Sequence, residues 1–121
     1  MHAHAVNLAY FKDLIAEMGY DIVEAFTPPP VGNLSLEEAR AAWGKDTIIW
    51  VNFPETIFWS GAQETYRYTL DLLEKDPRPD KLVIGFTEMG IYGVTDDESE
   101  LSFKDGVCAI LDAIDDFAGR R

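Results

Sequence analysis

Residues 47–53 read Thr-Ile-Ile-Trp-Val-Asn-Phe, and this stretch decides the class of fold. Almost all of it is apolar, which is typical of a strand buried on both faces of a sheet. Residues 82–87 (LVIGFT) repeat that pattern, and residues 20–26 (YDIVEAF) also favour a strand. Strands buried on both faces belong to parallel sheets, and helices connect parallel strands. The sequence therefore predicts a parallel α/β fold.

A helix is expected before the first of these strands. Asn7 can cap its start, and Gly19 can end it. Its apolar face, at helical spacing, is formed by Leu8, Phe11, Leu14, Ile15 and Met18. We expect this face to pack against the core.

The connections between the strands are also predicted to be helical. Ser35 and Glu38 form a capping box ahead of a short helix, and Ser60 and Gln63 offer a second capping box. Apolar residues at helical spacing over residues 103–117 predict a last helix. Helices and strands thus alternate along the chain, as they do in parallel sheets whose strands are joined by covering helices.

The composition limits the class of partner. The chain has 121 residues, 47% of them hydrophobic, and a formal net charge of −12. This charge repels nucleic acid and anionic membranes, so we expect a small-molecule substrate. The single cysteine, Cys108, lies in an apolar helical pattern that predicts a buried side chain, and it cannot form a disulfide within the chain. With no membrane-spanning run and no signal pattern, the sequence favours the cytoplasm.

Polar residues occur at the ends of the predicted strands. Glu24, Asn52 and Glu88 each follow several apolar residues near the end of a strand. The carboxyl ends of parallel strands form the site in α/β folds, so these three residues are candidates for it. Each of them can instead cap a neighbouring helix or bond the backbone of a loop.

Two histidines open the chain. In an extended segment, His2 and His4 project to the same side, which suits two imidazoles on one metal ion. They precede a helix, so they also lie at a strand-to-helix junction, beside the polar strand ends. Two histidines and a carboxylate form a recognised zinc site. The competing interpretation is a frayed N-terminus that faces solvent.

Residues 24–44 (EAFTPPPVGNLSLEEARAAWG), followed by residues 47–54 (TIIWVNFP), resemble the C-terminal half of the uroporphyrinogen decarboxylase-like superfamily. This superfamily contains porphyrinogen decarboxylases and cobalamin-linked methyltransferases. The resemblance covers residues 1–121 and implies a (β/α)8 TIM-type barrel whose open end binds substrate. Such barrels need about 250 residues. The chain therefore corresponds to about half a barrel, with three complete strands and a stub of a fourth at His-Ala-His.

The sequence is compatible with three explanations for a chain of half a barrel: an excerpt of a longer protein, a truncated reading frame and a genuine half-barrel. A genuine half-barrel would leave the sheet edges exposed, and two copies could close one barrel as a homodimer. Otherwise, a missing N-terminal half supplies the remaining strands.

The methyltransferase branch of the superfamily implies a zinc site made of a His-x-Cys pair and a later cysteine. His2 matches the first ligand, His4 replaces the cysteine of the pair, and Glu88 takes the place of the later cysteine. Nitrogen and oxygen ligands make a harder site that still suits zinc, but the exchange does not carry thiol methylation over. The decarboxylase branch holds its substrate with residues of the N-terminal half, so decarboxylation is not carried over either.

The leading hypothesis is a divalent metal held by His2, His4 and Glu88, which acts as a Lewis acid on a bound thiol, carboxylate or water. Glu24 would be a general base or a further ligand, and Asn52 would orient the substrate. One alternative is a non-catalytic half-barrel that forms homodimers. Another is an inactive remnant whose polar strand ends are merely satisfied by hydrogen bonds.

Overall fold

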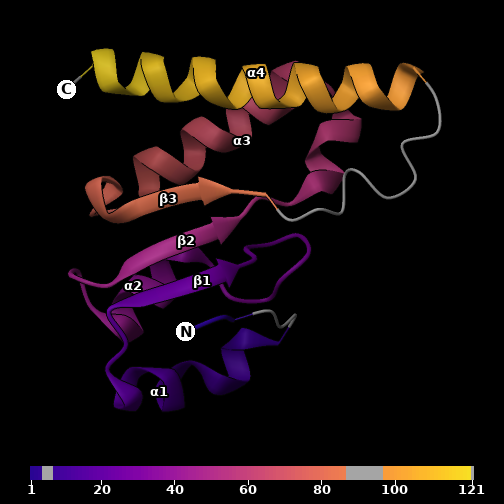
Figure 1. Cartoon of the computed structure of the whole chain (residues 1–121). Coiled ribbons are helices and arrows are strands. Elements are labelled where there is room, and N and C mark those ends of the chain that lie inside the picture. The colour runs from indigo at the N-terminus through magenta and orange to yellow at the C-terminus, as the bar shows by residue number, and fades with distance from the viewer. Residues whose placement is uncertain (4–6, 87–96, 121) are drawn as a thin grey trace. The chain divides into compact units, whose positions relative to one another are not determined.

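The computed structural model of the chain describes residues 1–3, 7–86 and 97–120. Within these residues, three parallel strands alternate with four α-helices (Figure 1). The strands are β1 (Ile22–Phe26), β2 (Ile48–Asn52) and β3 (Leu82–Gly85). The helices are α1 (Leu8–Met18), α2 (Leu36–Trp43), α3 (Ala62–Lys75) and α4 (Asp97–Gly119), with short 3-10 helices at η1 (Glu55–Ser60) and η2 (Pro79–Lys81). The predicted α/β class with a parallel sheet is confirmed.

The chain divides into two compact units. The first comprises Met1–Pro54 and Lys75–Thr87, and it contains α1, α2 and the sheet. The second comprises Glu55–Glu74 and Glu88–Arg121, and it contains η1, nearly all of α3, and α4. The candidate residues that the structure describes all belong to the first unit.

The sheet has the order β1-β2-β3. Residues 1–3 extend it at the β1 side, where His2 forms a parallel bridge with Glu24. The backbone N–H of Glu24 donates to the Met1 carbonyl at 2.7 Å, and the N–H of Ala3 donates to the Glu24 carbonyl at 2.6 Å. An isolated β-bridge therefore continues the sheet at residues 1–3, where the stub of a fourth strand was predicted.

One face of the sheet is covered by α1 and α2. Val23, Ile49 and Val51 point to this face and are at most 1% exposed. Ile15 of α1 and Trp43 of α2 line the same small cavity as Val23. Both helices therefore pack on one side of the sheet, and their apolar contacts with it form the core of the first unit.

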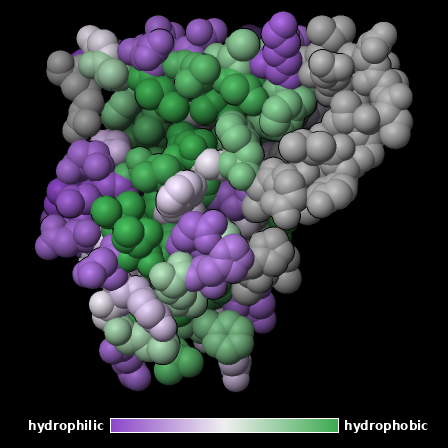
Figure 2. Space-filling view, in the orientation of Figure 1, coloured by the Kyte–Doolittle hydropathy of each residue, from purple (hydrophilic) through white to green (hydrophobic). Residues whose placement is uncertain are grey.

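Among the described residues of the first unit, no helix covers the opposite face, and we call it the open face. Side chains alternate along a strand, so every second residue of the sheet faces this side. These residues are Ile22, Glu24, Ile48, Trp50, Asn52 and Val83. Ile22 is 43% exposed, Trp50 is 44% exposed and Val83 is 39% exposed. Figure 2 shows hydrophobic residues gathered over the strands on this side of the sheet. The prediction that β2 and β3 are buried on both faces is therefore wrong, because α1 and α2 cover only one.

The indole of Trp50 reaches across the open face to β3. A Cβ atom at Gly85, which pairs with Asn52 two residues beyond the Trp50–Val83 pair, would lie 2.3 Å from the Trp50 Nε1 atom. No real side chain tolerates that separation. The glycine therefore makes room for the indole to lie over the adjacent strand.

Local signals set several helix ends as predicted. Gly19 ends α1 in the left-handed region, at φ 66°. Ser35 and Glu38 form the predicted capping box at the start of α2, with hydrogen bonds of 3.0 and 3.1 Å. The backbone N–H of Ser35 donates to the Glu38 carboxylate, and this hydrogen bond is the main reason that the pKa of Glu38 lies below its usual value. The side chain of Ser35 lowers that pKa further. The second capping box is wrong, because α3 begins at Ala62, beyond Ser60.

The start of α1 is capped from a distance. Asn7 occupies the N-cap position, but its side chain makes no cap hydrogen bond, contrary to the prediction. The side-chain oxygen of Asn33 instead accepts the backbone N–H of Ala9 at 3.1 Å. The Asn33 amide also donates to the Asn7 Oδ1 atom at 2.7 Å. A loop residue between β1 and α2 therefore supplies the cap.

Replacing Asn33 by alanine is expected to lower the free energy of unfolding by about 1 kcal/mol, because the Ala9 N–H loses its acceptor. Urea denaturation followed by circular dichroism measures the change. Asn33→Asp is the matched control, because its carboxylate can still accept that N–H and carries a charge that suits a helix start. Equal losses in the two variants would contradict the assigned cap.

A buried ion pair joins the amino ends of β2 and β3 to α2. The Arg40 side chain is 2% exposed and that of Asp76 is fully buried. Arg40 donates to both carboxylate oxygens of Asp76, at 2.9 and 3.2 Å. It also donates to the backbone carbonyls of Thr47, Arg78 and Lys81. One guanidinium thus holds three backbone segments in place.

Arg78 and Asp80, ahead of β3, form a second pair at the surface. The Nη2 and Nε atoms of Arg78 donate to the two carboxylate oxygens of Asp80 at 2.7 and 2.9 Å. These hydrogen bonds lower the pKa of Asp80 to about 2. Because the folded pKa is depressed, the pair contributes stability above the ordinary pKa of 3.8, and this is lost as the pH falls toward 2.

An NMR titration of the side-chain carboxyl carbons is expected to give Asp80 a pKa of about 2 in the folded protein. The substitution Arg78→Gln should return that pKa toward 3.8, since the donors are removed. Arg67→Gln, which removes a different surface arginine, should leave the Asp80 titration unchanged. An Asp80 pKa that does not respond to Arg78→Gln would contradict the pairing.

In the second unit, η1 and α4 pack through aromatic rings. The rings of Phe58 and Phe103 meet edge to face, with centroids 5.6 Å apart. A Cβ atom at Gly106 would lie 2.3 Å from the Phe58 ring, so this glycine inside a helix serves close packing. Cys108, on the same helix, is exposed, so its predicted burial is wrong.

Candidate functional site

Because β1, β2 and β3 are parallel, their carboxyl ends lie at the same edge of the sheet (Figure 1). Glu24 lies in β1, Asn52 ends β2, and the bridge to β1 brings His2 beside Glu24. The three candidate residues that the structure describes therefore come from β1, from β2 and from the bridged segment beside β1. Of these, His2 and Glu24 are in direct contact.

His2 and Glu24 form a hydrogen-bonded pair between the Nδ1 atom of the imidazole and the Oε2 atom of the carboxylate. The His2 side chain is 62% exposed and the Glu24 side chain is 39% exposed. Because a carboxylate only accepts, a neutral His2 in this pair carries its proton on Nδ1. The lone pair is then on Nε2, the atom that binds a metal or accepts a proton.

Asn52 lies on the open face, two residues after Trp50. Its Nδ2 atom donates to the Thr27 Oγ1 atom at 3.2 Å. Thr27 is 8% exposed and begins the loop that follows β1. Thr27 was not among the candidate residues predicted from the sequence. The residues around Thr27 do not indicate that it binds Asn52, which lies 25 residues further along the chain.

A β-bulge lies beside Glu24. The pairing of β1 with β2 changes register between Val23 and Phe26. Within this stretch, Ala25 has φ 60°, a left-handed conformation that costs a residue with a side chain roughly 1–2 kcal/mol. Bulges of this kind bend a strand and re-aim its side chains, and they are common next to functional sites. Here the bulge separates Glu24 from the loop that begins at Thr27.

The predicted metal ligands are described only in part. His4 and Glu88 lie outside the described residues. Among the residues that the structure does describe, no three His, Cys, Asp or Glu side chains gather as a metal-binding group. His2 fits a zinc ligand by its chemistry, since metal-bound imidazoles usually donate their other N–H to a carboxylate such as Glu24.

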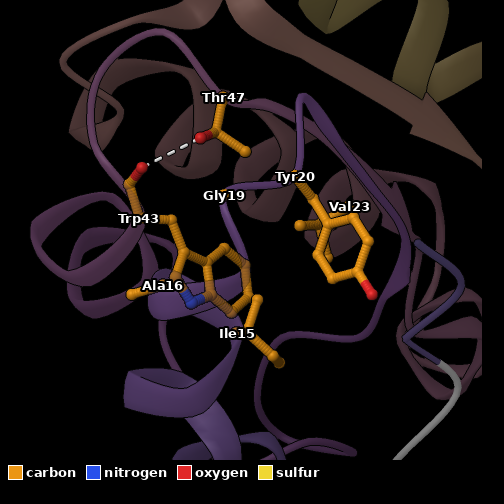
Figure 3. Close-up of a pocket in the computed structure, with 7 residues that line it drawn as sticks. All are labelled: Ile15, Ala16, Gly19, Tyr20, Val23, Trp43 and Thr47. Atoms are coloured by element: carbon orange, nitrogen blue, oxygen red, sulfur yellow. Dashed lines mark hydrogen bonds between the residues drawn. The ribbon is translucent and has the colours of Figure 1, made fainter.

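A small cavity lies near the amino ends of β1 and β2, whereas Glu24 and Asn52 lie toward the carboxyl ends of these strands. Figure 3 shows the residues that line the cavity. Its lining is formed by Ile15, Ala16, Gly19, Tyr20, Val23, Trp43 and Thr47. The Thr47 hydroxyl donates across its edge to the Trp43 carbonyl at 2.9 Å. With a volume of about 20 Å³, the cavity has room for about one water molecule. It is therefore a packing defect rather than a substrate site.

The second unit has a wider and shallower groove of about 300 Å³ along η1 and α3. Glu64 and Arg67, both in its lining, bond each other at 2.8 Å. Burial raises the pKa of Tyr68, and the nearby carboxylate of Asp71 raises it further. The groove is therefore lined by a neutral tyrosine together with Glu64, Arg67 and Asp71. Glu64 and Arg67 already form an ion pair with each other.

Comparison with protein-family models, curated proteins and solved structures finds no match to this chain. Among the described residues, no helix is both long enough and apolar enough to cross a membrane.

Proposed function

We propose that the first unit is part of a half-barrel of the (β/α)8 type. Its strands are parallel, residues 1–3 continue the sheet beyond β1, and α1 and α2 cover one face only. A doubly wound sheet has helices on both faces, whereas a barrel has helices outside and side chains inside. In this proposal the open face is the lining of the barrel.

The proposed activity is that of an enzyme acting on a small molecule at the strand ends. The observation that carries it is the hydrogen bond between the His2 Nδ1 atom and Glu24. Glu24 would fix the orientation and the tautomer of His2, so that Nε2 takes a proton from the substrate or binds a metal. Asn52 would orient the substrate through its side-chain amide. Such imidazole–carboxylate pairs recur in acid–base and zinc sites.

The resemblance to the uroporphyrinogen decarboxylase-like superfamily favours a metal site of the methyltransferase type at the strand ends, without carrying thiol methylation itself over. In that case His2, His4 and Glu88 would hold zinc, which supplies a Lewis acid when bound. A decarboxylase-like reaction is the second possibility within the same superfamily. Both proposals place the substrate against the open face, near His2.

Two measurements test the site. In nitrogen-15 NMR spectra, neutral His2 is expected to carry its proton on Nδ1, and Glu24→Gln should shift the tautomer populations because the carboxylate acceptor is removed. In zinc titrations, Glu24→Gln should weaken binding by about 10- to 100-fold, and His2→Ala should weaken it at least as much. Glu37→Gln, at an exposed glutamate of α2, is the matched control.

The two measurements separate the two parts of the proposal. Unchanged tautomer populations in Glu24→Gln would remove the pair on which the site depends. Zinc binding that is equally weak in the unaltered protein and in His2→Ala would remove the metal and leave an acid–base site.

A further inference from the structure

The bulge in β1 places a carboxylate opposite the exposed tryptophan of the sheet. The pairing of β1 with β2 is regular up to Val23 and resumes at Phe26. Between these two positions β1 has Glu24 and Ala25, whereas β2 has only Trp50. Glu24 and Trp50 both belong to the open face, so a carboxylate and an indole occupy neighbouring strands on one side of the sheet.

These two residues belong to a row that crosses the open face, and we call it the cross-strand row (His2, Glu24, Trp50 and Val83). His2 forms the bridge with Glu24, and Trp50 pairs with Val83. The row therefore carries an imidazole, a carboxylate, an indole and an apolar side chain, in that order. All four residues lie in the first unit, so their arrangement is set by the sheet alone.

The indole of Trp50 is exposed and yet held in place. It lies on the central strand of the sheet and is 44% exposed. Its Nε1 atom lies so close to β3 that only a glycine fits at position 85. The negative face of an indole ring attracts organic cations, and tryptophan is the best of the aromatic side chains for this contact. The open face therefore presents a positioned surface for a cation.

The charge of the open face favours the same class of ligand. Among the described residues of this face, Glu24 carries a negative charge and there is no lysine or arginine. The Glu24 side chain is 39% exposed, so a ligand can reach it. The chain as a whole has a formal charge of −12, which attracts cations and repels anions. A carboxylate beside an aromatic face suits an alkylated ammonium group.

Charge also distinguishes the open face from a second apolar surface of the first unit. Phe11, Leu14 and Met18 of α1 are exposed, contrary to the prediction that they pack against the core. None of these three side chains carries a charge, so they do not select a ligand by its charge. The open face does so through Glu24.

We propose that Glu24 and Trp50 bind a small organic ammonium ion. Its alkyl groups would lie against the indole of Trp50, and its charge would be balanced by the Glu24 carboxylate. This names the substrate class of the strand-end site, and it rests on the proposed function for the claim that the bound ion is a substrate. The binding itself requires only Glu24 and Trp50. Because His2 is bonded to Glu24, the ion would be bound in the same row as the proposed acid–base group.

An NMR titration of the full chain with choline, in the presence of EDTA, tests the binding. The backbone amide signals of Trp50 and Val83 are expected to shift, with a dissociation constant on the order of 1 mM. Added salt should raise that constant, because it screens the attraction to the carboxylate. The alcohol 3,3-dimethylbutan-1-ol has the shape of choline without its charge and should bind at least about tenfold more weakly. Equal binding of the two compounds would overturn the assignment of a cation.

Substitutions identify the two groups that hold the ion. Glu24→Gln should weaken choline binding at least about fivefold, because the carboxylate charge is lost. Trp50→Leu should weaken it about five- to tenfold, and Trp50→Phe should weaken it less, because a phenyl ring keeps part of the attraction. Trp59→Leu is the matched control, at an exposed tryptophan of the second unit, and should leave the dissociation constant unchanged. If Trp50→Leu does not fold, Trp50→Phe still gives the comparison.

Choline binding that is as strong in the folded Trp50 variants as in the unaltered protein would overturn the proposal, as would the absence of any shift at about 50 mM choline. The tautomer of His2 separates this failure from that of the proposed function. If choline binds but the tautomer does not respond to Glu24→Gln, the ammonium site stands and the proposed function fails. If the tautomer responds but choline does not bind, the proposed function stands and the ammonium site fails.

Discussion

Replacing Arg40 by methionine is expected to lower the free energy of unfolding by about 3–5 kcal/mol. The side chain of Asp76 is fully buried, so removal of its partner leaves an uncompensated charge. The carbonyls of Thr47, Arg78 and Lys81 lose a donor at the same time. Urea denaturation followed by tryptophan fluorescence measures the loss.

Further substitutions at this ion pair identify its components. Arg40→Lys should recover only part of the loss, because an ammonium cannot donate to both oxygens and three carbonyls in the same geometry. The double variant Arg40→Met with Asp76→Leu should be more stable than the two single losses predict when added. If Arg40→Met does not fold, Arg40→Lys still gives the comparison. A loss below about 1 kcal/mol in Arg40→Met would contradict the role of the pair.

Replacing Gly32 by alanine is expected to lower the free energy of unfolding by about 2–3 kcal/mol and to displace the loop after β1. An added Cβ atom would lie 1.8 Å from the Thr27 carbonyl oxygen. This neighbour is backbone, so the clash cannot be relieved by a rotamer change. The hydrogen bond from the Gly32 N–H to the Pro28 carbonyl, 3.1 Å long, would be strained as well.

The loop displacement has its own measurement. Asn52 donates to Thr27, so the NMR signals of the Asn52 side-chain amide should shift in Gly32→Ala. Gly119→Ala is the matched control, because a Cβ atom there meets nothing within 4 Å. Unaltered stability together with unaltered Asn52 signals in Gly32→Ala would contradict the close approach of these backbones.

The elements that could be predicted are those whose cause is local. The capping box of Ser35 with Glu38 spans three residues, and Gly19 acts on the turn in which it lies. The apolar runs around Ile49 and Leu82 gave the strands nearly in full. Each of these features depends on residues within one or two turns, so their spacing in the sequence is enough to find them.

The features that sequence reasoning missed join distant residues. Arg40 pairs with Asp76 across 36 positions, and Asn52 bonds Thr27 across 25. Nothing near either residue marks the partner. The exposure of Trp50 was missed for another reason: an apolar strand has the same sequence whether its second face meets a helix, a second chain or solvent.

The candidate site was predicted in part. The sequence placed His2 and Glu24 among the polar groups at the strand ends, and the two are hydrogen-bonded there. It did not predict the bulge at Ala25, because alanine is not a residue that marks a left-handed conformation. The grouping with His4 and Glu88 stays a prediction.

The cap of α1 has a consequence for the order of folding. Its acceptor, Asn33, comes 24 residues after the N–H that it binds. An 11-residue helix is marginal without tertiary contacts. The first helix of the chain therefore acquires a fixed start only after β1 and the turn beyond it have been made. A nascent chain that ends before residue 33 would carry this segment as a fluctuating coil, and α1 would become ordered after elements that follow it in the sequence.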